Sequence, residues 1–369
     1  MAAFPQEPMK RRSFLQSAAV AASTVAFPSL LRAADKAGTK RAIVGTGEHT
    51  YECHHGWGEL PSHLKWGETH GVAVDGQGFI YIKNNTGPSG LRHQDCIVVF
   101  DPNGKFVRSF GDEYSAFNIH TVGHGIDIRK EGGTEYLYLT HTWANLVTKT
   151  TLDGEIVWAL STPWESGVYK DRKEFIPTNV AFHPTDGSFY IADGYGSGYI
   201  HRYDANGKYL SSFGGRGGAD QHGKFSTPHG LWVDNRPGRE PMLCICDRAN
   251  ARLEYFSLDG KYVSTVSGLS YPAHLDIRGD VMVCPDLHAR VTLFDKNNQV
   301  ISHLGYDQAW TDRVLNKGGQ GGFVMRTQPK TWEDGRFIHP HDACFDRDGN
   351  LFVVEWVSVG RVSKLRKVA

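Results

Sequence analysis

Short stretches in which apolar and polar residues alternate recur along most of the chain, separated by turns rich in glycine, asparagine and aspartate. Two complete rounds of one pattern follow each other near its centre, PTNVAFHPTDGSFYIADGYGSGYIHRYDANGKYLSSFG and TPHGLWVDNRPGREPMLCICDRANARLEYFSLDGKYVSTV. Each round predicts four short strands, with a tight turn, Asn206-Gly207 or Asp259-Gly260, before the fourth. Such turns need residues that tolerate positive φ. A four-stranded unit repeated at this spacing is typical of a β-propeller blade.

Six copies of the first strand of this unit can be aligned on one position, which is histidine in five of them. The equivalent residues are His70, His124, Asn179, His229, His274 and His341. They lie 54, 55, 50, 45 and 67 residues apart, near the roughly 40 to 50 residues of a known propeller blade. The sequence therefore predicts an all-β protein, a six-bladed β-propeller that occupies residues 35–369.

The sixth copy lacks an outer hairpin, because the sequence stops at VSKLRKVA. We expect the apolar stretch Arg41–Thr50 to supply the fourth strand, so that an N-terminal strand closes the last blade. Closure of this kind removes two exposed sheet edges. Two insertions, Asn84–Gln94 and Tyr306–Gly335, interrupt the repeat, and loops of such length are functional or disordered more often than they are spacers.

Residues 1–34 are expected to be an export signal that takes no part in the fold. The letters KRRSFL at positions 10–15 precede an apolar, alanine-rich run, and Ala33 and Ala34 offer a cleavage site. This pattern resembles a twin-arginine signal. A Sec signal or a membrane anchor is the alternative, but the apolar run is shorter than the roughly 20 residues that a membrane span needs. We expect a periplasmic or extracellular protein with no membrane span in the mature chain.

Charge and cysteine content exclude two classes of protein. The 369 residues include 40 Lys and Arg against 40 Asp and Glu, so a nucleic-acid partner, which requires a basic surface, is not expected. The six cysteines are too few for a disulfide framework. The 18 histidines are more informative about function than the charge or the cysteines, because of where they lie. Five of them begin blades, and the starts of a propeller's inner strands converge at the mouth of its central channel.

Imidazoles that converge on one axis are suited to bind a divalent metal. A catalytic Zn²⁺ site uses three protein ligands and keeps a fourth position open. The alternative is that each histidine caps its own strand by a hydrogen bond to a backbone carbonyl. Independent capping does not predict repetition at one structural position, so the pattern favours a metal site.

Several segments resemble one known family. They are GHGIDI, DGYGSGYIHRYDANGKYLSSFG, GKFSTPHGLWVD, CDRANARLEYF and HPHDACFDRDGNLFVVEW. These segments are similar to the lyase domain of peptidylglycine α-amidating enzymes, peptidyl-α-hydroxyglycine α-amidating lyase, a six-bladed propeller of the NHL-repeat type. The layout matches over most of the chain, whereas the residue-specific match covers about a third of it.

The resemblance implies a catalytic Zn²⁺ and a structural Ca²⁺ in the channel. By matching motifs, the zinc ligands are His124, His229 and His341. The calcium ligands are two backbone carbonyls and one carboxylate, those of Val72, Ile126 and Asp342, which are the hard oxygen ligands that calcium prefers. The matching catalytic residues are Tyr195 and Arg248. The alternatives are loop packing for Tyr195 and an ion pair with Asp247 or Asp193 for Arg248. The sequence departs from the family at Asn84, beside Lys83, where an arginine is expected, and at His339, where a methionine is expected.

Three functions follow from these observations. The first is a zinc lyase that cleaves a carbinolamide of a small-molecule or peptide substrate into an amide and glyoxylate. A separate hydroxylating enzyme is the expected source of that substrate. The second is a non-catalytic NHL-type propeller that binds a protein or glycan through aromatic residues in Trp143–Trp164 and Tyr306–Gly335. The third, a calcium-dependent hydrolase, ranks last because such enzymes need a channel dominated by carboxylates.

Overall fold

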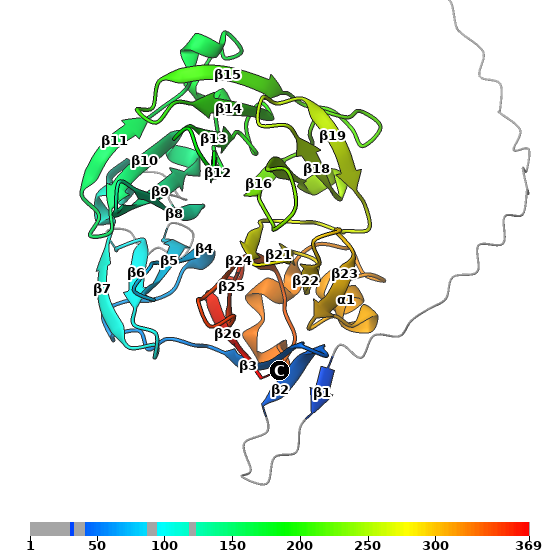
Figure 1. The fold of residues 1–369 in the computed structure, drawn as a ribbon. Helices are drawn as coiled ribbons and strands as arrows, with labels where there is room; N and C mark the ends of the chain where they lie inside the picture. The colour runs from blue at the N-terminus through cyan, green and yellow to red at the C-terminus, as the bar shows by residue number, and fades with distance from the viewer. Residues whose placement is uncertain (1–29, 33–40, 87–93, 118–122, 369) are drawn as a thin grey trace, which may run out of the picture.

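Six antiparallel sheets form the blades of a ring (Figure 1). The computed structural model describes residues 30–32, 41–86, 94–117 and 123–368, so nearly all of the predicted export signal lies outside the described residues. In five sheets the first strand lies nearest the axis and the fourth at the rim, whereas strands from the start of the described chain form the rim of the last sheet (Figure 1). The predicted six-bladed propeller is confirmed.

The first three blades contain four strands each. Their strands are β4 (Glu68–Val74), β5 (Ile80–Asn85), β6 (Ile97–Phe100), β7 (Phe106–Phe110), β8 (Ile126–Glu131), β9 (Thr134–His141), β10 (Leu146–Thr151), β11 (Ile156–Leu160), β12 (Asn179–Phe182), β13 (Phe189–Ala192), β14 (Tyr199–Tyr203) and β15 (Tyr209–Gly214). The next two blades follow the same order. Their strands are β16 (Pro228–Asp234), β17 (Met242–Asp247), β18 (Arg252–Phe256), β19 (Tyr262–Val266), β20 (Asp276–Arg278), β21 (Val281–Asp286), β22 (Arg290–Phe294) and β23 (Val300–Leu304).

The last blade joins the two ends of the described chain. Its strands are β24 (Pro340–Phe345), β25 (Leu351–Glu355), β26 (Arg361–Lys367), β3 (His49–His55), β2 (Ala42–Thr46) and β1 (Leu30–Arg32). The fourth strand is β3, which pairs with β26, and not the predicted Arg41–Thr50. That prediction was wrong because Gly47, with a positive φ of 54°, turns the chain back after Thr46. Residues 42–46 therefore form a further strand outside β3.

Apolar side chains packed between neighbouring blades form the core. One cluster joins the first blade to the second through residues that include Tyr81 and Leu139. Another contains Cys244, Cys246 and Cys284. All six cysteines are buried and free of disulfide bonds, so they act as small apolar core residues.

Short helices connect the strands. They are α1 (Gln308–Val314) and the 3₁₀ helices η1 (Asp112–Phe117), η2 (Thr142–Ala144), η3 (Trp164–Ser166), η4 (Arg172–Glu174), η5 (Arg248–Asn250), η6 (Val324–Thr327) and η7 (Pro329–Thr331). Among the described residues, no helix has the length and apolar character that crossing a membrane requires.

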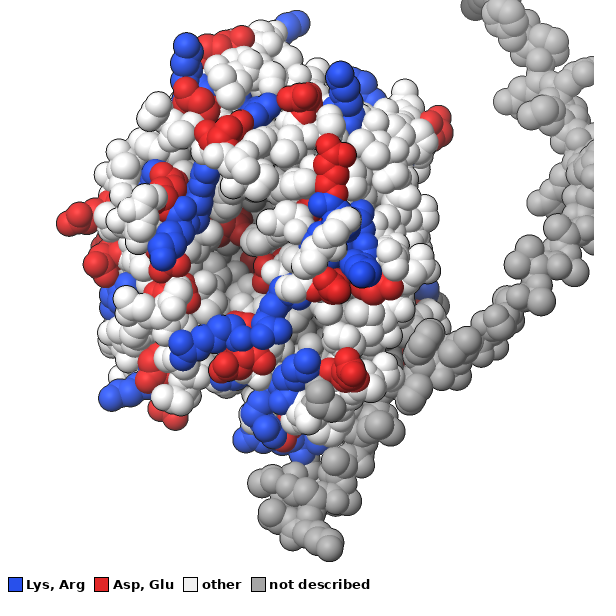
Figure 2. All heavy atoms as spheres, in the orientation of Figure 1, with Lys and Arg blue, Asp and Glu red and all other residues white. Residues whose placement is uncertain are grey.

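The insertion 306–335 is a packed element of the propeller. The Asp307 carboxylate accepts a hydrogen bond from the Trp310 main-chain N–H and caps α1. Trp310 and Met325 lie in one buried cluster. From η6, Arg326 forms an ion pair with Glu68 at the start of the first blade. The insertion is thereby tied to the inner ends of the strands. Figure 2 shows acidic and basic side chains interspersed around a central hollow on one face.

Candidate metal centre and active site

Three histidines from alternate blades meet near the propeller axis, and we call them the three-histidine cluster. His124 precedes β8, whereas His229 and His341 are the second residues of β16 and β24. The strand pairing shifts register beside two of them, between Pro228 and Leu231 and between Pro340 and Asp342. A β-bulge re-aims the side chains next to it. These bulges explain how residues near the start of a paired strand point along the axis instead of into the sheet.

Each member of the cluster is held by the blade that follows it. The three Nδ1 atoms lie 2.7–2.8 Å from main-chain oxygens, those of Thr178, Ala273 and His70. A carbonyl oxygen can only accept, so each Nδ1 must carry the proton. The capping that sequence analysis offered as an alternative therefore does occur, and it leaves each Nε2 with a free lone pair.

The Nε2 atoms of the cluster face one another. All three ligand atoms lie within 4.8 Å of one another, and the Nε2 atoms of His124 and His229 are 3.1 Å apart. Burial holds the pKa of all three imidazoles well below the ordinary 6.5. Three neutral, oriented imidazoles are the donor set that Zn²⁺ prefers, with room for a fourth ligand. The residues present fit zinc.

The other channel histidines do not join this cluster. The Nδ1 of His70 lies 3.1 Å from the Glu68 main-chain oxygen, although its ring lies 4.6 Å from that of His341. His274 faces a separate group of carboxylates. His339, a candidate further ligand, is fully buried with its Nδ1 2.6 Å from the Leu287 oxygen. It packs on aromatic rings and lies outside the group of possible metal ligands.

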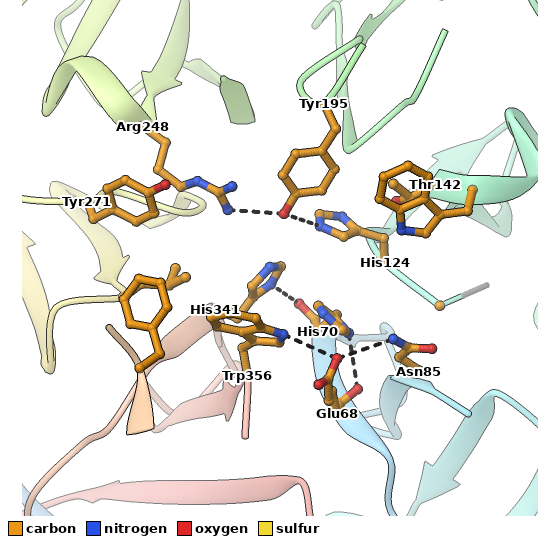
Figure 3. Close-up of a pocket in the computed structure, with 14 residues that line it drawn as sticks. Glu68, His70, Asn85, His124, Thr142, Tyr195, Arg248, Tyr271, His341 and Trp356 are labelled. Atoms are coloured by element: carbon orange, nitrogen blue, oxygen red, sulfur yellow. Dashed lines mark hydrogen bonds between the residues drawn. The ribbon is translucent and has the colours of Figure 1, made fainter. Parts of the chain in front are cut away.

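Tyr195 reaches the same point from the loop after β13. Its hydroxyl lies 3.3 Å from Nε2 of His124 (Figure 3) and 3.0 Å from Nε2 of His229. Its main-chain N–H donates to the Ile176 oxygen, which fixes the loop. The loop-packing alternative does not account for a hydroxyl aimed at two imidazole nitrogens. A group bound at the cluster would lie within reach of this oxygen.

Arg248 is the first residue of η5 and points into the same space (Figure 3). Its NH1 donates to the Tyr195 hydroxyl over 3.1 Å, and its guanidinium lies 4.9 Å from the centre of the Tyr271 ring. The ion-pair alternative is wrong, because Asp247 pairs with Arg252 at 2.8 Å. The buried Nε of Arg248 has no hydrogen-bond partner among the described residues. The guanidinium is therefore available to an anionic ligand.

Two members of the cluster, His124 and His341, line one cavity of about 480 Å³ together with Tyr195 and Arg248. Its lining residues are Glu68, His70, Asn85, Gly123, His124, Thr142, Trp143, Tyr195, Arg248, Tyr271, Leu287, Phe323, His341 and Trp356. Sequence analysis did not single out Glu68, Asn85, Phe323 or Trp356 as site residues, although Trp356 ends a matched segment and Asn85 and Phe323 lie in the two insertions. The volume is in the range of small-molecule sites, about 300–1,000 Å³.

Comparisons with known proteins find several sequence relatives of this chain. Peptidyl-glycine alpha-amidating monooxygenase A of Xenopus laevis is 29% identical over 281 residues, which are 74% of this chain and 27% of that protein. A probable peptidyl-alpha-hydroxyglycine alpha-amidating lyase of Caenorhabditis elegans is 26% identical over 46% of this chain and 45% of its own length. Human NHL repeat-containing protein 3 is 28% identical over 55% of this chain and 56% of its own length. The chain is a homologue of these α-amidating and NHL-repeat proteins. No model of a known protein family matches it.

Solved structures show the shared fold. A gluconolactonase of Xanthomonas campestris covers 90% of this chain with a TM-score of 0.54 and 13% identity. A virginiamycin B lyase of Staphylococcus aureus covers 86% with a TM-score of 0.50 and 12% identity. At such identities the similarity concerns the propeller alone. The chain is thus a propeller that is related in sequence to these α-amidating and NHL-repeat proteins.

The departure at Asn84 has a structural explanation. Asn84 is fully buried, its Oδ1 accepts from the Gly67 N–H and its Nδ2 donates to the Cys96 oxygen. The neighbouring Asn85 lines the cavity instead. An arginine at position 84 would have to bury its charge in a site already filled, so Asn84 is a framework residue and not a weakened substrate contact.

Lys83 beside it is also fully buried, and its Nζ donates to the main-chain oxygens of Gly125 and Thr140 over 3.3 and 2.8 Å. Burial lowers its pKa from 10.5 to about 7. Because the folded pKa lies below the unfolded one, the stability associated with this amine is present above about pH 10 and is lost as the pH falls towards 7.

We expect Lys83→Met to flatten this pH dependence. The difference in unfolding free energy between the wild type and the variant should change by about 1.4 kcal/mol per pH unit between pH 7 and 10. Urea unfolding at pH 7, 8 and 9 measures it, and Lys65→Met, at an exposed lysine, is the control. A constant difference across these pH values would contradict a shifted Lys83.

The residues matched to a calcium site also lie together. Asp342 is buried, its Oδ2 accepts from the Val72 N–H over 2.9 Å, and Ile126 is fully buried nearby in β8. Asp127 lines the same small cavity, and its buried Oδ2 has no partner among the described residues. His274 Nε2 lies 3.7 Å from oxygens of both carboxylates. A buried excess of carboxylates and an unpaired oxygen fit a hard cation.

Proposed function

We propose that this protein is a zinc-dependent lyase that cleaves an N-acyl-α-hydroxyglycine into an amide and glyoxylate. The observation that carries the proposal is the convergence of the three-histidine cluster with Tyr195 and Arg248 in one cavity. The homologues include a probable α-amidating lyase, which supports the same class of reaction. Zinc held by His124, His229 and His341 would act as a Lewis acid on the substrate hydroxyl.

Two protein side chains have separate roles, one in substrate binding and one in proton transfer. Arg248 presents a planar guanidinium that suits the substrate carboxylate. With the carboxylate held there, the carbinol carbon lies between Arg248 and the cluster, beside the Tyr195 oxygen. Tyr195, as the phenolate, takes the hydroxyl proton as a general base. The O–H electron pair forms the second C–O bond of glyoxylate, and the C–N bond breaks. The nitrogen leaves with the C–N electron pair and receives the proton from Tyr195, which gives the amide.

The direct test measures glyoxylate. Purified protein, stripped of metal and reloaded with one equivalent of zinc, is incubated with N-acyl-α-hydroxyglycines that carry several acyl groups. The zinc-loaded protein should release glyoxylate and the matching amide in equal amounts, and the stripped protein should not. Absence of glyoxylate with every acyl group would leave a propeller that binds a ligand without turning it over.

We further propose a structural Ca²⁺ held by Asp342 and the carbonyls of Val72 and Ile126. Support comes from three carboxyl groups in this small cavity, those of Asp127, Asp276 and Asp342. Among its described lining residues, only His274 can offset their negative charge. Burial raises the pKa of Asp342 to about 7, a sign of an uncompensated site. Elemental analysis of the protein, purified without chelator, should find one calcium per chain.

Export is proposed on the basis of residues 10–34, which lie outside the described residues except for Leu30–Arg32. Replacing Arg11 and Arg12 together with lysine should abolish appearance of the protein outside the cytoplasm, because twin-arginine signals are read through that pair. Cell fractionation measures it, with the unaltered signal as control. Undiminished export of the double variant would contradict the twin-arginine route.

A further inference from the structure

Two charged side chains, Arg248 and Glu68, line the cavity. Arg248 has no carboxylate partner in the described structure, whereas Glu68, the other charged lining residue, is paired with Arg326. The second oxygen of Glu68 accepts from Asn85 Nδ2 and from Trp356 Nε1 over 3.3 and 3.2 Å (Figure 3). Glu68 is thus neutralised and satisfied. A ligand whose carboxylate lies at Arg248 meets no other unpaired charge in the cavity.

Aromatic rings cover much of the remaining lining, and we call Trp143, Tyr271, Phe323 and Trp356 the aromatic wall. The rings of Phe323 and Trp356 make an edge-to-face contact with centroids 5.4 Å apart. Arg326 stacks on Trp356 at 3.7 Å from its centroid and fixes that ring from behind. Four separate segments therefore present aromatic rings to one space.

Trp143 is the exposed member of the wall. Its side chain is 49% exposed although it lines the cavity. Trp164, in the next connection, is similarly exposed at 52% but lies outside the lining of this cavity. When a flat ligand stacks on a large, exposed apolar ring at a binding site, the apolar surface of that ring is removed from water, which favours binding.

We propose that the aromatic wall is an acyl-binding subsite that selects N-acyl-α-hydroxyglycines with an aromatic acyl group. The orientation rests on the proposed function, since it places the substrate carboxylate at Arg248 and the reacting carbon at the three-histidine cluster. The acyl group on nitrogen then extends away from the cluster towards Trp143, Phe323 and Trp356. The cavity of about 480 Å³ is sized for one such group and not for a long peptide.

Binding of unreactive analogues tests the subsite without turnover. N-Benzoylglycine and N-acetylglycine lack the hydroxyl that is cleaved, and isothermal titration calorimetry gives their Kd values on the zinc-loaded protein. N-Benzoylglycine should bind at least about tenfold more tightly. Trp143→Ala should reduce that ratio severalfold, Phe323→Ala should do the same from the opposite segment, and Trp164→Ala should leave it unchanged.

The outcomes separate this inference from the lyase proposal. Equal Kd values for the two analogues, or an equal loss of the ratio in Trp164→Ala, would overturn the acyl subsite even if glyoxylate is released. A preserved ratio that depends on Trp143 and Phe323 supports the subsite even if no acyl-hydroxyglycine is cleaved. In that case the lyase proposal fails and the protein is a binding propeller for aromatic acylamino acids.

Discussion

Replacing any one of His124, His229 and His341 with alanine should reduce bound zinc from one per chain to a small fraction. In the proposed zinc site each imidazole would supply one of three nitrogen ligands, and its orientation is fixed by a carbonyl of the next blade. Two remaining ligands leave the ion with too few protein donors for tight binding. Glyoxylate release should fall by on the order of 10³, since a Lewis acid contributes several kcal/mol to such a reaction.

Inductively coupled plasma mass spectrometry measures the zinc, and thermal unfolding shows whether each variant is folded. His70→Ala is the matched control for metal content, because its ring lies beside the cluster but its Nδ1 is bonded to the Glu68 oxygen. Full zinc in all three single variants would place the ligands elsewhere. Loss of zinc in His70→Ala alone would show that this fourth imidazole is a ligand.

Tyr195→Phe should slow glyoxylate release by a factor on the order of 10² to 10⁴, the usual contribution of a positioned general base. The substitution removes one oxygen that lies 3.0 Å from His229 Nε2 and 3.1 Å from Arg248 NH1, and it leaves the ring in place. The loss should appear in kcat, because the proton moves only in the transition state. Zinc content should stay at one per chain, which separates this effect from the histidine variants.

Steady-state kinetics with N-benzoyl-α-hydroxyglycine measures the effect. Tyr199→Phe, in β14 outside the lining of the cavity, is the control and should keep wild-type kcat. Unchanged kcat in Tyr195→Phe would exclude this tyrosine as the base.

Arg248→Met should instead raise KM more than it lowers kcat, since a carboxylate contact persists from ground state to transition state.

The repeat and the candidate cluster could be predicted because their signals are local. Hairpin turns such as Asn206-Gly207 reveal themselves through residues that accept positive φ, and Gly207 has a φ of 80°. Alternation with a period of two marks each strand and the face it buries. One recurring histidine position identified the ends of the inner strands, and two motif residues, Tyr195 and Arg248, follow the second strands of their blades.

The tertiary structure alone decided which equivalent positions meet. His70, His124 and His274 occupy the equivalent position of the repeat in three blades. Of these three, only His124 turns its Nε2 to the cluster. The direction depends on the hydrogen-bond partner: His70 bonds a carbonyl of its own strand, whereas His124 bonds a carbonyl of the next blade, 54 positions away. The turn at Gly47 decided in the same way that His49–His55 completes the last blade.

The sequence by itself determined the propeller, its number of blades and the chemistry available at its axis, because these follow from periodicity and residue type. It did not determine the shape of the substrate cavity. The pairing of Glu68 with Arg326 and the aromatic wall bring together segments separated by up to 258 positions. No local pattern encodes such proximity, since it arises only when the ring closes and the insertion packs against the first blade.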